Sequence, residues 1–210
     1  MGRAVIRIEP VAKNDPELHR LMAVHYTHPK GFVGRQLFFH ITWAGTLYGC
    51  IAFGSATRYL PGRPTSVADL THGLNNIFYH IEKQDGRYPC RNFTTRALLL
   101  AEPLAIAAYE TRYHDAVWWL ESLVELPRTG DLYRKAGYRE VGITKGYTCR
   151  RVGGNVLTEV FDGRRVWNMD PNSLRPKRVF LKDVPHEATP RFDLFDPAPV
   201  DWSRPSHSLS

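Results

Sequence analysis

One carboxylate lies in a segment that is otherwise apolar, where it could act as a proton acceptor. Residues 117–124 are almost wholly apolar apart from Glu121 and Ser122, which is the pattern of a strand buried on both faces. Burial raises the pKa of a carboxyl group unless it is paired, and a raised pKa suits a base that works near neutrality. Glu121 is therefore a candidate base, with a structural salt bridge to Arg96 or another nearby arginine as the alternative.

A candidate phosphate site lies at the start of the longest apolar helix pattern, which extends from about residue 95 to residue 113. Either Thr94 or Thr95 is expected to cap this helix, and Pro103 is expected to kink it. The first amides of a helix lack partners and the helix dipole is positive there, so this end attracts phosphates. The candidate cofactor-binding residues are Arg91, Asn92, Thr94, Thr95 and Arg96.

The chain has a formal net charge of +7, and the excess is concentrated between residues 134 and 182. A moderate basic excess favours an anionic partner, such as nucleic acid or a phosphorylated cofactor. Cations could contact phosphates, and the aromatic side chains between them could stack on a base. The alternative is a solvated basic hairpin with core aromatics. The candidate nucleic-acid-binding residues are Arg35, Lys145, Tyr147, Arg150, Arg151, Arg164, Arg165 and Arg178.

Metal chemistry has weaker support in the sequence. His25 and His28 are three residues apart at the expected end of a helix and could share a face. A zinc site needs at least one more ligand, so we expect no metal and a plain helix end. The cysteines Cys50, Cys90 and Cys149 are far apart and odd in number, which favours neither a disulfide framework nor a cysteine zinc site.

Local signals predict the helices and the first hairpin. Asp15 is expected to cap a helix over residues 16–26, because its side chain can accept from the free amides of the first turn. Residues 44–46 link two aromatic and β-branched runs, which is the pattern of a hairpin. Thr129 is expected to cap a short helix that ends at Gly137.

The strand signals are short apolar or alternating runs. In the run after residue 75, alternation places Ile77 and Tyr79 on one face and Phe78 and His80 on the other. The expected strands are 5–8, 36–43, 47–53, 76–82, 117–124 and 138–144, with shorter ones at 147–151, 156–161 and 179–182.

The 210 residues suit one α/β domain with appended segments. We expect a domain over residues 1–183, in which 145–182 form a basic β extension, and a Pro-rich extended tail over 184–210. No apolar run approaches the roughly 20 residues that a membrane span needs, and the first 30 residues lack a signal-peptide pattern. These features predict a cytoplasmic protein without a membrane partner.

The element order and the run from Leu132 to Gly142 resemble the GNAT fold, in which helices flank a central mixed, mostly antiparallel sheet. The resemblance implies an acyl-CoA site between two splayed central strands. It also implies that a tyrosine on the short helix protonates the leaving thiolate, and Tyr133 occupies that position. The alternative for Tyr133 is a packing role. The glycine-rich turn typical of this fold is replaced here by residues 91–97, which contain no glycine.

A narrower resemblance is to the A-protein family of Druantia anti-phage systems and to Mom-type phage DNA-modification proteins, which carbamoylmethylate adenine in DNA. It rests on short blocks at 33–37, 49–54, 74–76, 120–125 and 130–133. It implies that Glu125, with Glu121 as its neighbour, accepts the proton of the exocyclic amine of adenine. The further matching positions are Asn92, Thr95 and His80.

Three hypotheses about function follow. The first is a transferase that modifies adenine in double-stranded DNA, with the base flipped out of the helix. The second is a GNAT N-acetyltransferase that uses acetyl-CoA, and the third is a non-catalytic DNA-binding protein of an anti-phage system. The donor is open between acetyl-CoA and another acyl donor. A homodimer and a bacterial host cytoplasm complete these expectations.

Overall fold

The structure is a computed structural model of the chain. It describes residues 5–146 except 28, 30, 31, 33, 58, 59 and 61–69, and it also describes residues 174–185. Between these parts it describes the backbone of six short strands: β7 (Thr148–Cys149), β8 (Arg151–Val152), β9 (Asn155–Val156), β10 (Thr158–Phe161), β11 (Arg164–Trp167) and β12 (Met169–Asp170).

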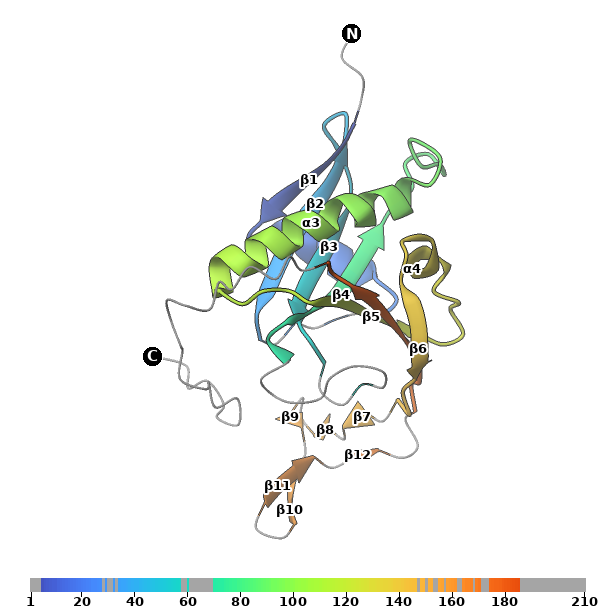
Figure 1. The fold of residues 1–210 in the computed structure, drawn as a ribbon. Coiled ribbons are helices and arrows are strands. Elements are labelled where there is room, and N and C mark those ends of the chain that lie inside the picture. The colour runs from blue at the N-terminus through green and yellow to red at the C-terminus, as the bar shows by residue number, and fades with distance from the viewer. Residues whose placement is uncertain are drawn as a thin grey trace.

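A seven-stranded sheet in the order β1-β2-β3-β4-β5-β13-β6 forms the centre of the molecule (Figure 1). Every neighbouring pair is antiparallel except β4 and β5, which are parallel. The expectation of a mixed, mostly antiparallel sheet is therefore confirmed. The strands are β1 (Ile6–Val11), β2 (Gln36–Trp43), β3 (Thr46–Ser55), β4 (Gly73–Ile81), β5 (Trp119–Glu125), β6 (Arg139–Ile143) and β13 (Lys177–Asp183).

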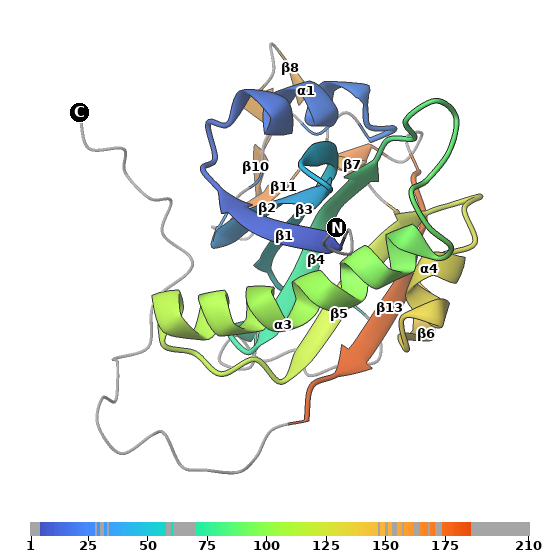
Figure 2. The same cartoon turned by 90° about the horizontal axis from the view of Figure 1, so that it is seen from above.

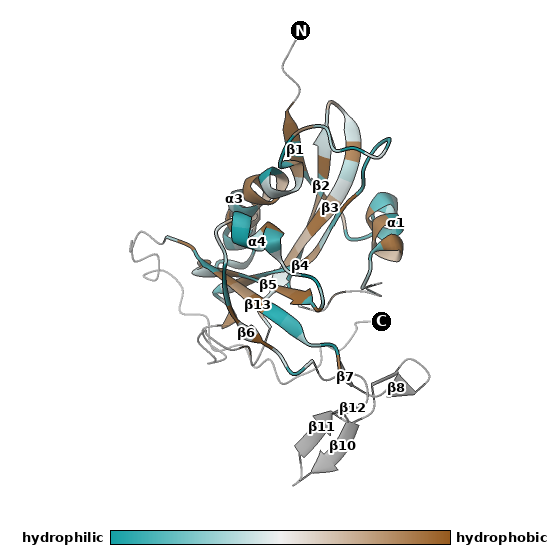
Figure 3. Cartoon of the chain, turned by 90° about the vertical axis from the view of Figure 1, so that its right-hand side faces the viewer, coloured by the Kyte–Doolittle hydropathy of each residue, from teal (hydrophilic) through white to brown (hydrophobic). Residues whose placement is uncertain are grey.

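Helices cover both faces of the sheet (Figures 2 and 3). The long helix α3 (Phe93–Tyr113) and the short helix α4 (Asp131–Lys135) lie on one face, and α1 (Pro16–Val24) lies on the other. The larger apolar core lies beneath α3 and α4, and a smaller one lies beneath α1. We call these two sides the α3 face and the α1 face. None of the described helices is long and apolar enough to cross a membrane.

The first helix and the first hairpin form for the reasons predicted. The Asp15 carboxylate accepts a hydrogen bond from the Leu18 amide at 2.8 Å, and the helix ends at Val24, two residues earlier than expected. The β2–β3 link is a two-residue turn in which Ala44 and Gly45 both have positive φ, 50° and 80°. Such turns match the twist of the paired strands.

The predicted caps of the other two helices were wrong. Helix α3 begins at Phe93, and its N-cap is Asn92, which has left-handed backbone angles and makes no side-chain capping bond. Helix α4 is preceded by Gly130 and not by a threonine cap. Gly130 has a φ of 76°, and a Cβ there would lie 2.3 Å from Cζ of Phe180, so the position needs a glycine for both reasons. The helix α3 continues through Pro103.

The strand β13 has a position that the sequence did not predict. It lies between β5 and β6 and is antiparallel to both, so the chain leaves the sheet after β6 and returns to fill the gap. The strands β7–β12 belong to the intervening segment, residues 144–176, which we call the insertion. In the described residues they pair only with one another, in three two-stranded sheets.

Candidate functional site

The two parallel strands at the centre of the sheet separate along their length. Residues 73–76 of β4 pair with residues 119–122 of β5. No pair joins the rest of β4, which continues to Ile81, to the rest of β5, which continues to Glu125. The last pair is Asn76 with Ser122, and we call the opening beyond it the β4–β5 split. Backbone groups that have no strand partner remain available to a ligand there.

A β-bulge distorts β4 where the split begins. The register with β3 shifts between Ala52, which pairs with Phe78, and Phe53, which pairs with Asn76, so Ile77 is the extra residue. The Asn76 amide donates to the Ala52 and Phe78 carbonyls at 2.9 and 3.1 Å and so holds the bulge on both sides. Ile77 and Phe78 both pack on the α1 face, so the predicted alternation at Ile77 was wrong.

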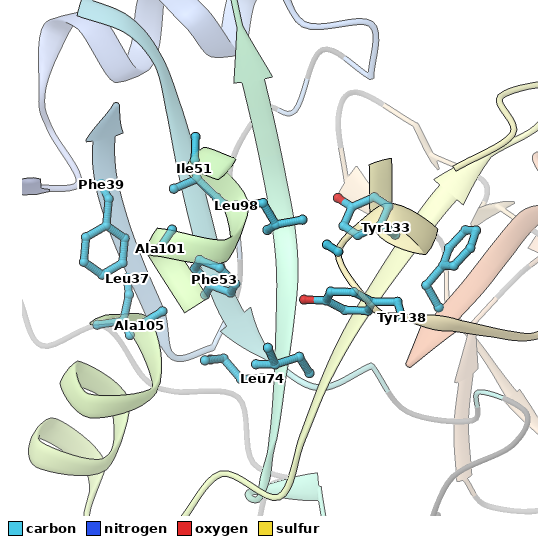
Figure 4. Close-up of a cluster of buried hydrophobic side chains, with 14 of the residues drawn as sticks. Leu37, Phe39, Ile51, Phe53, Leu74, Leu98, Ala101, Ala105, Tyr133 and Tyr138 are labelled. Atoms are coloured by element: carbon cyan, nitrogen blue, oxygen red, sulfur yellow. The ribbon is translucent and has the colours of Figure 1, made fainter. Parts of the chain in front are cut away.

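Tyr133 of α4 reaches the start of the split from the α3 face (Figure 4). Its hydroxyl donates to Asn76 Oδ1 at 2.6 Å, and its ring packs against Tyr138 and Phe180 with centroid distances of 5.3 and 5.6 Å. The side chain is buried, with 8% of the residue exposed, and burial raises its pKa. The phenol therefore stays protonated near neutral pH and can act as a proton donor. Tyr133 packs in the core and also faces the candidate site.

Glu121 lies on the opposite face of β5 from Tyr133. Successive side chains of a strand point to opposite faces, and Leu120 and Val124 pack in the core with Tyr133, so Ser122 shares the α3 face and Glu121 does not. The Glu121 carboxylate is fully buried and accepts from the Thr57 amide at 2.5 Å and from Trp119 Nε1 at 3.3 Å. The structure thus gives Glu121 a role in holding the segment after β3, and it does not bring Glu121 to Tyr133. The predicted partner, Arg96, instead bonds the Cys90 sulfur at 3.4 Å.

Glu125 lies half-buried at the end of β5, at the wide end of the split. Tyr26, just after α1, interacts electrostatically with Glu125, and burial together with the Glu125 charge raises the Tyr26 pKa. The Arg128 guanidinium lies 3.5 Å from the centroid of the Tyr26 ring, a cation–π distance. These three side chains therefore connect the end of α1 to the end of β5 on the α1 face.

His80 is the basic side chain of β4 beyond the bulge. It is partly buried beside His25, whose ring centroid lies 5.6 Å away, and its Nε2 is 3.9 Å from Glu82 Oε1. Burial lowers the pKa of His80 more than the Glu82 carboxylate raises it. The imidazole is therefore neutral at pH 7 and can accept a proton. The sequence singled out His80 only by a family position, whereas the structure adds the burial that lowers its pKa.

The phosphate candidates lie at the start of α3, next to β4. The Tyr79 hydroxyl donates to the Thr94 carbonyl at 2.5 Å and joins the strand to the first turn of the helix. The helix has no side-chain cap, and Asn92 has a φ of 56°, a left-handed conformation that glycine usually supplies. Arg91 and Arg96 are exposed beside it. A glycine-free sequence thus still presents uncapped amides and two cations at one helix end.

The nucleic-acid candidates do not form one described cluster. Arg35 is partly buried, ion-paired with Asp115 and bonded to the Tyr109 hydroxyl at 3.1 Å. Arg178 bonds Glu140 at 2.6 Å, and Lys145 is exposed after β6. Tyr147 and Arg150 lie outside the described residues, and so do the side chains of Arg151, Arg164 and Arg165.

The described residues contain no group of three or more His, Cys, Asp or Glu side chains placed to hold a metal ion. The His25 ring packs 4.8 Å from that of Phe78, and its Nδ1 lies 2.8 Å from the Thr27 hydroxyl. His28, its proposed companion, lies outside the described residues. His25 therefore has a packing role in the small core.

Comparisons with known proteins identify the fold. No family model and no curated protein matches the sequence. An acetyltransferase of Bacillus subtilis, solved in complex with CoA, is 14% identical with a TM-score of 0.53, over 86% of this chain and 99% of that one. A GNAT family acetyltransferase from Elizabethkingia anophelis with acetyl-CoA bound is 12% identical with a TM-score of 0.52, over 85% and 98%. The chain therefore has the fold of the GNAT acetyltransferases, as its element order predicted.

Proposed function

We propose that the protein is an acyltransferase that moves an acyl group from a CoA thioester to an amine. The observation that carries the proposal is the β4–β5 split with the protonated Tyr133 phenol buried at its start. The two structural neighbours, which were solved with CoA and with acetyl-CoA, support the same donor. Fold alone does not define an activity, which depends on the groups placed around the split.

The groups around the split fit the two proton transfers that this reaction needs. The amine must lose a proton as it attacks the thioester carbonyl, and neutral His80 on the α1 side of β4 is the candidate acceptor. The C–S bond then breaks, and the sulfur takes the Tyr133 proton to leave as a thiol. The uncapped start of α3, with Arg91 and Arg96, would bind the phosphates of the donor.

Calorimetry with acetyl-CoA tests the proposal directly. We expect saturable binding, and we expect Arg91→Gln with Arg96→Gln to weaken it about tenfold, because charge-assisted bonds to phosphate are lost. Arg112→Gln is the matched control, since Arg112 is an exposed arginine at the opposite end of the same helix. Absence of binding by folded wild-type protein would exclude a CoA-dependent transferase.

A second candidate is a transferase that acts on adenine in DNA. Its support is the net charge of +7, with six of the 28 lysines and arginines in the insertion, and the resemblance to Mom-type proteins. Such an enzyme would use the same split with a flipped base as the acceptor. Nucleosides from the DNA of expressing cells should then contain an adenine of increased mass. Salt-dependent DNA binding with unchanged nucleosides would instead indicate a non-catalytic DNA-binding protein.

A further inference from the structure

Buried polar atoms without a normal hydrogen bond gather on the α3 face around Tyr133. Among the described residues, five buried side-chain atoms make no hydrogen bond of normal geometry, and three of them are Ser122 Oγ, Tyr138 Oη and Glu102 Oε1. Ser122 nevertheless interacts with the Tyr133 hydroxyl, and Glu102 interacts with the Tyr138 hydroxyl. Ser122 pairs with Asn76 at the start of the split, and Tyr138 packs edge-on against the Tyr133 ring. Folded proteins leave few such atoms, so a group of them beside one candidate proton donor calls for a functional explanation.

Glu102 links this group to the surface. It lies on α3 with 4% of the residue exposed, and its Oε2 is ion-paired with the Lys182 ammonium of β13. The Lys182 side chain is 26% exposed, and its Nζ lies 5.5 Å from the centroid of the Tyr138 ring. Burial raises the Glu102 pKa although the Lys182 charge opposes it, so the carboxyl group takes up a proton more readily than an exposed one.

Tyr138 and Tyr133 extend this polar group from Glu102 toward β4. Their ring centroids are 5.3 Å apart, and Figure 4 shows both hydroxyl oxygens pointing toward β4. The Glu102 carboxylate acts electrostatically on both phenols and raises the pKa of each, with burial as the larger cause. Glu102, Tyr138 and Tyr133 therefore share one poorly solvated polar region, in which buried water can bridge unsatisfied groups.

The proposed reaction creates a need for such a connection. Tyr133 gives its proton to the leaving sulfur and must recover one before the next turnover. Only 8% of the residue is exposed, and the donor would occupy the split in front of it. A phenolate in this apolar surrounding is strongly disfavoured, because burial raises the Tyr133 pKa. While CoA occupies the split, the new proton therefore has to arrive from the protein side.

We propose that Lys182, Glu102 and Tyr138 form a relay that returns a proton from solvent to Tyr133. The Glu102 carboxylate first takes a proton from solvent at the exposed Lys182 end. That proton passes to the Tyr138 oxygen while the Tyr138 proton passes, directly or through water, to the Tyr133 oxygen, and Glu102 is again ionised beside Lys182. One proton enters for each thiol released, and no oxidant or reductant is needed. The inference rests on the proposed acyl transfer.

Tyr138→Phe tests the relay, because it removes the hydroxyl that interacts with the Glu102 carboxyl group and keeps the ring that packs in the core. With acetyl-CoA as donor and methylamine as acceptor, we expect kcat for thiol release to fall about tenfold or more. We expect the KM for acetyl-CoA to change less than about twofold, since Tyr138 acts only through Tyr133. The solvent deuterium isotope effect on kcat should rise, and Glu102→Gln should behave in the same way.

Tyr113→Phe is the matched control, because Tyr113 lies on α3 beside Arg35 and outside this group. It should leave kcat and the isotope effect unchanged. If wild-type protein turns over and Tyr138→Phe matches it in kcat and isotope effect, the relay is refuted and the acyl transfer stands. If folded wild-type protein neither binds CoA nor releases thiol from acetyl-CoA, the proposed function fails and the relay fails with it.

Discussion

The Tyr133 hydroxyl donates to Asn76 Oδ1 at 2.6 Å, while the amide nitrogen of the same Asn76 side chain bonds the two carbonyls that flank the bulge in β4. One buried amide therefore fixes both the proton donor and the distortion that accompanies the opening of the sheet. The helix α4 and the strand β4 are far apart in sequence, so this bond also ties the two halves of the site together. The orientation of Tyr133 then depends on the bulge.

Removal of the Tyr133 hydroxyl should affect both rate and stability. Tyr133→Phe loses the proton donor, so we expect kcat for acetyl transfer to fall about 100-fold. The Asn76 Oδ1 acceptor becomes unpaired, and we expect the free energy of unfolding to fall by about 1–3 kcal/mol. Steady-state kinetics and urea denaturation would measure the two effects. An unchanged kcat in a folded variant would reduce Tyr133 to a packing residue.

Glu121 should affect stability without affecting chemistry. Its carboxylate accepts from the Thr57 amide and from Trp119, and Gln can replace only one of its two acceptor oxygens. We expect Glu121→Gln to lower the free energy of unfolding by about 1–3 kcal/mol. The kcat of the folded enzyme should be unchanged, because the Glu121 carboxylate is held by the Thr57 amide and the Trp119 indole. A large loss of kcat at unchanged stability would restore Glu121 as the base.

The sequence predicted the elements well, because their signals are local. The Asp15 cap, the turn at Ala44 and Gly45, and the apolar run of β5 all depend on neighbouring residues. The position of β13 was not predictable, because it depends on pairing with strands more than 30 residues away. Period-two alternation within β5 places Glu121 and Ser122 on opposite faces, so this part of the site was predictable from a local signal.

The site was only partly predictable, because it depends on contacts between residues that are far apart in the sequence. Tyr133 was found through the resemblance of its short helix to the GNAT fold, but its partner Asn76 lies on a distant strand. The bulge at Ile77 has no clear sequence signal, since it depends on the register with β3. His80 gained its importance from burial, which alternation alone does not determine.

Arg35 should stabilise the fold and should not contribute to nucleic-acid affinity. Its guanidinium pairs with Asp115, bonds Tyr109 and lies over the Tyr113 ring at 4.8 Å. We expect Arg35→Gln to lower the free energy of unfolding by about 2–3 kcal/mol, because Asp115 loses its partner. Any affinity for duplex DNA should be unchanged, whereas Lys145→Gln should weaken it. Fluorescence anisotropy at fixed salt would compare the two, and an equal loss in both would contradict this division.

His80 should make stability fall as the solution becomes acidic. Its pKa is lowered in the folded protein, so the folded state binds a proton less readily than the unfolded state. Stability is therefore unaffected well above pH 6.5, the ordinary value for histidine, and is lost as pH falls through that value. Its charged neighbours are Glu82 and Arg20, and the Glu82 carboxylate titrates at lower pH. His80→Gln should flatten the pH dependence of Tm just below neutrality, and an unchanged curve would contradict the burial argument.

Substitutions of Asn92 should show how its left-handed backbone affects stability and how its side chain affects phosphate binding. Left-handed angles cost a side chain about 1–2 kcal/mol, and glycine adopts them freely. We therefore expect Asn92→Ala to lower the free energy of unfolding by about 1 kcal/mol, and Asn92→Gly to leave it unchanged or raise it.

If the uncapped amides of α3 bind phosphate, Asn92→Gly should also keep its affinity for acetyl-CoA, because the backbone supplies the donors. Asn92→Asp should weaken that affinity, since its charge repels phosphate and its carboxylate can cap the same amides. Equal affinities for Asn92→Asp and Asn92→Gly in calorimetry would show that the donor phosphates bind elsewhere.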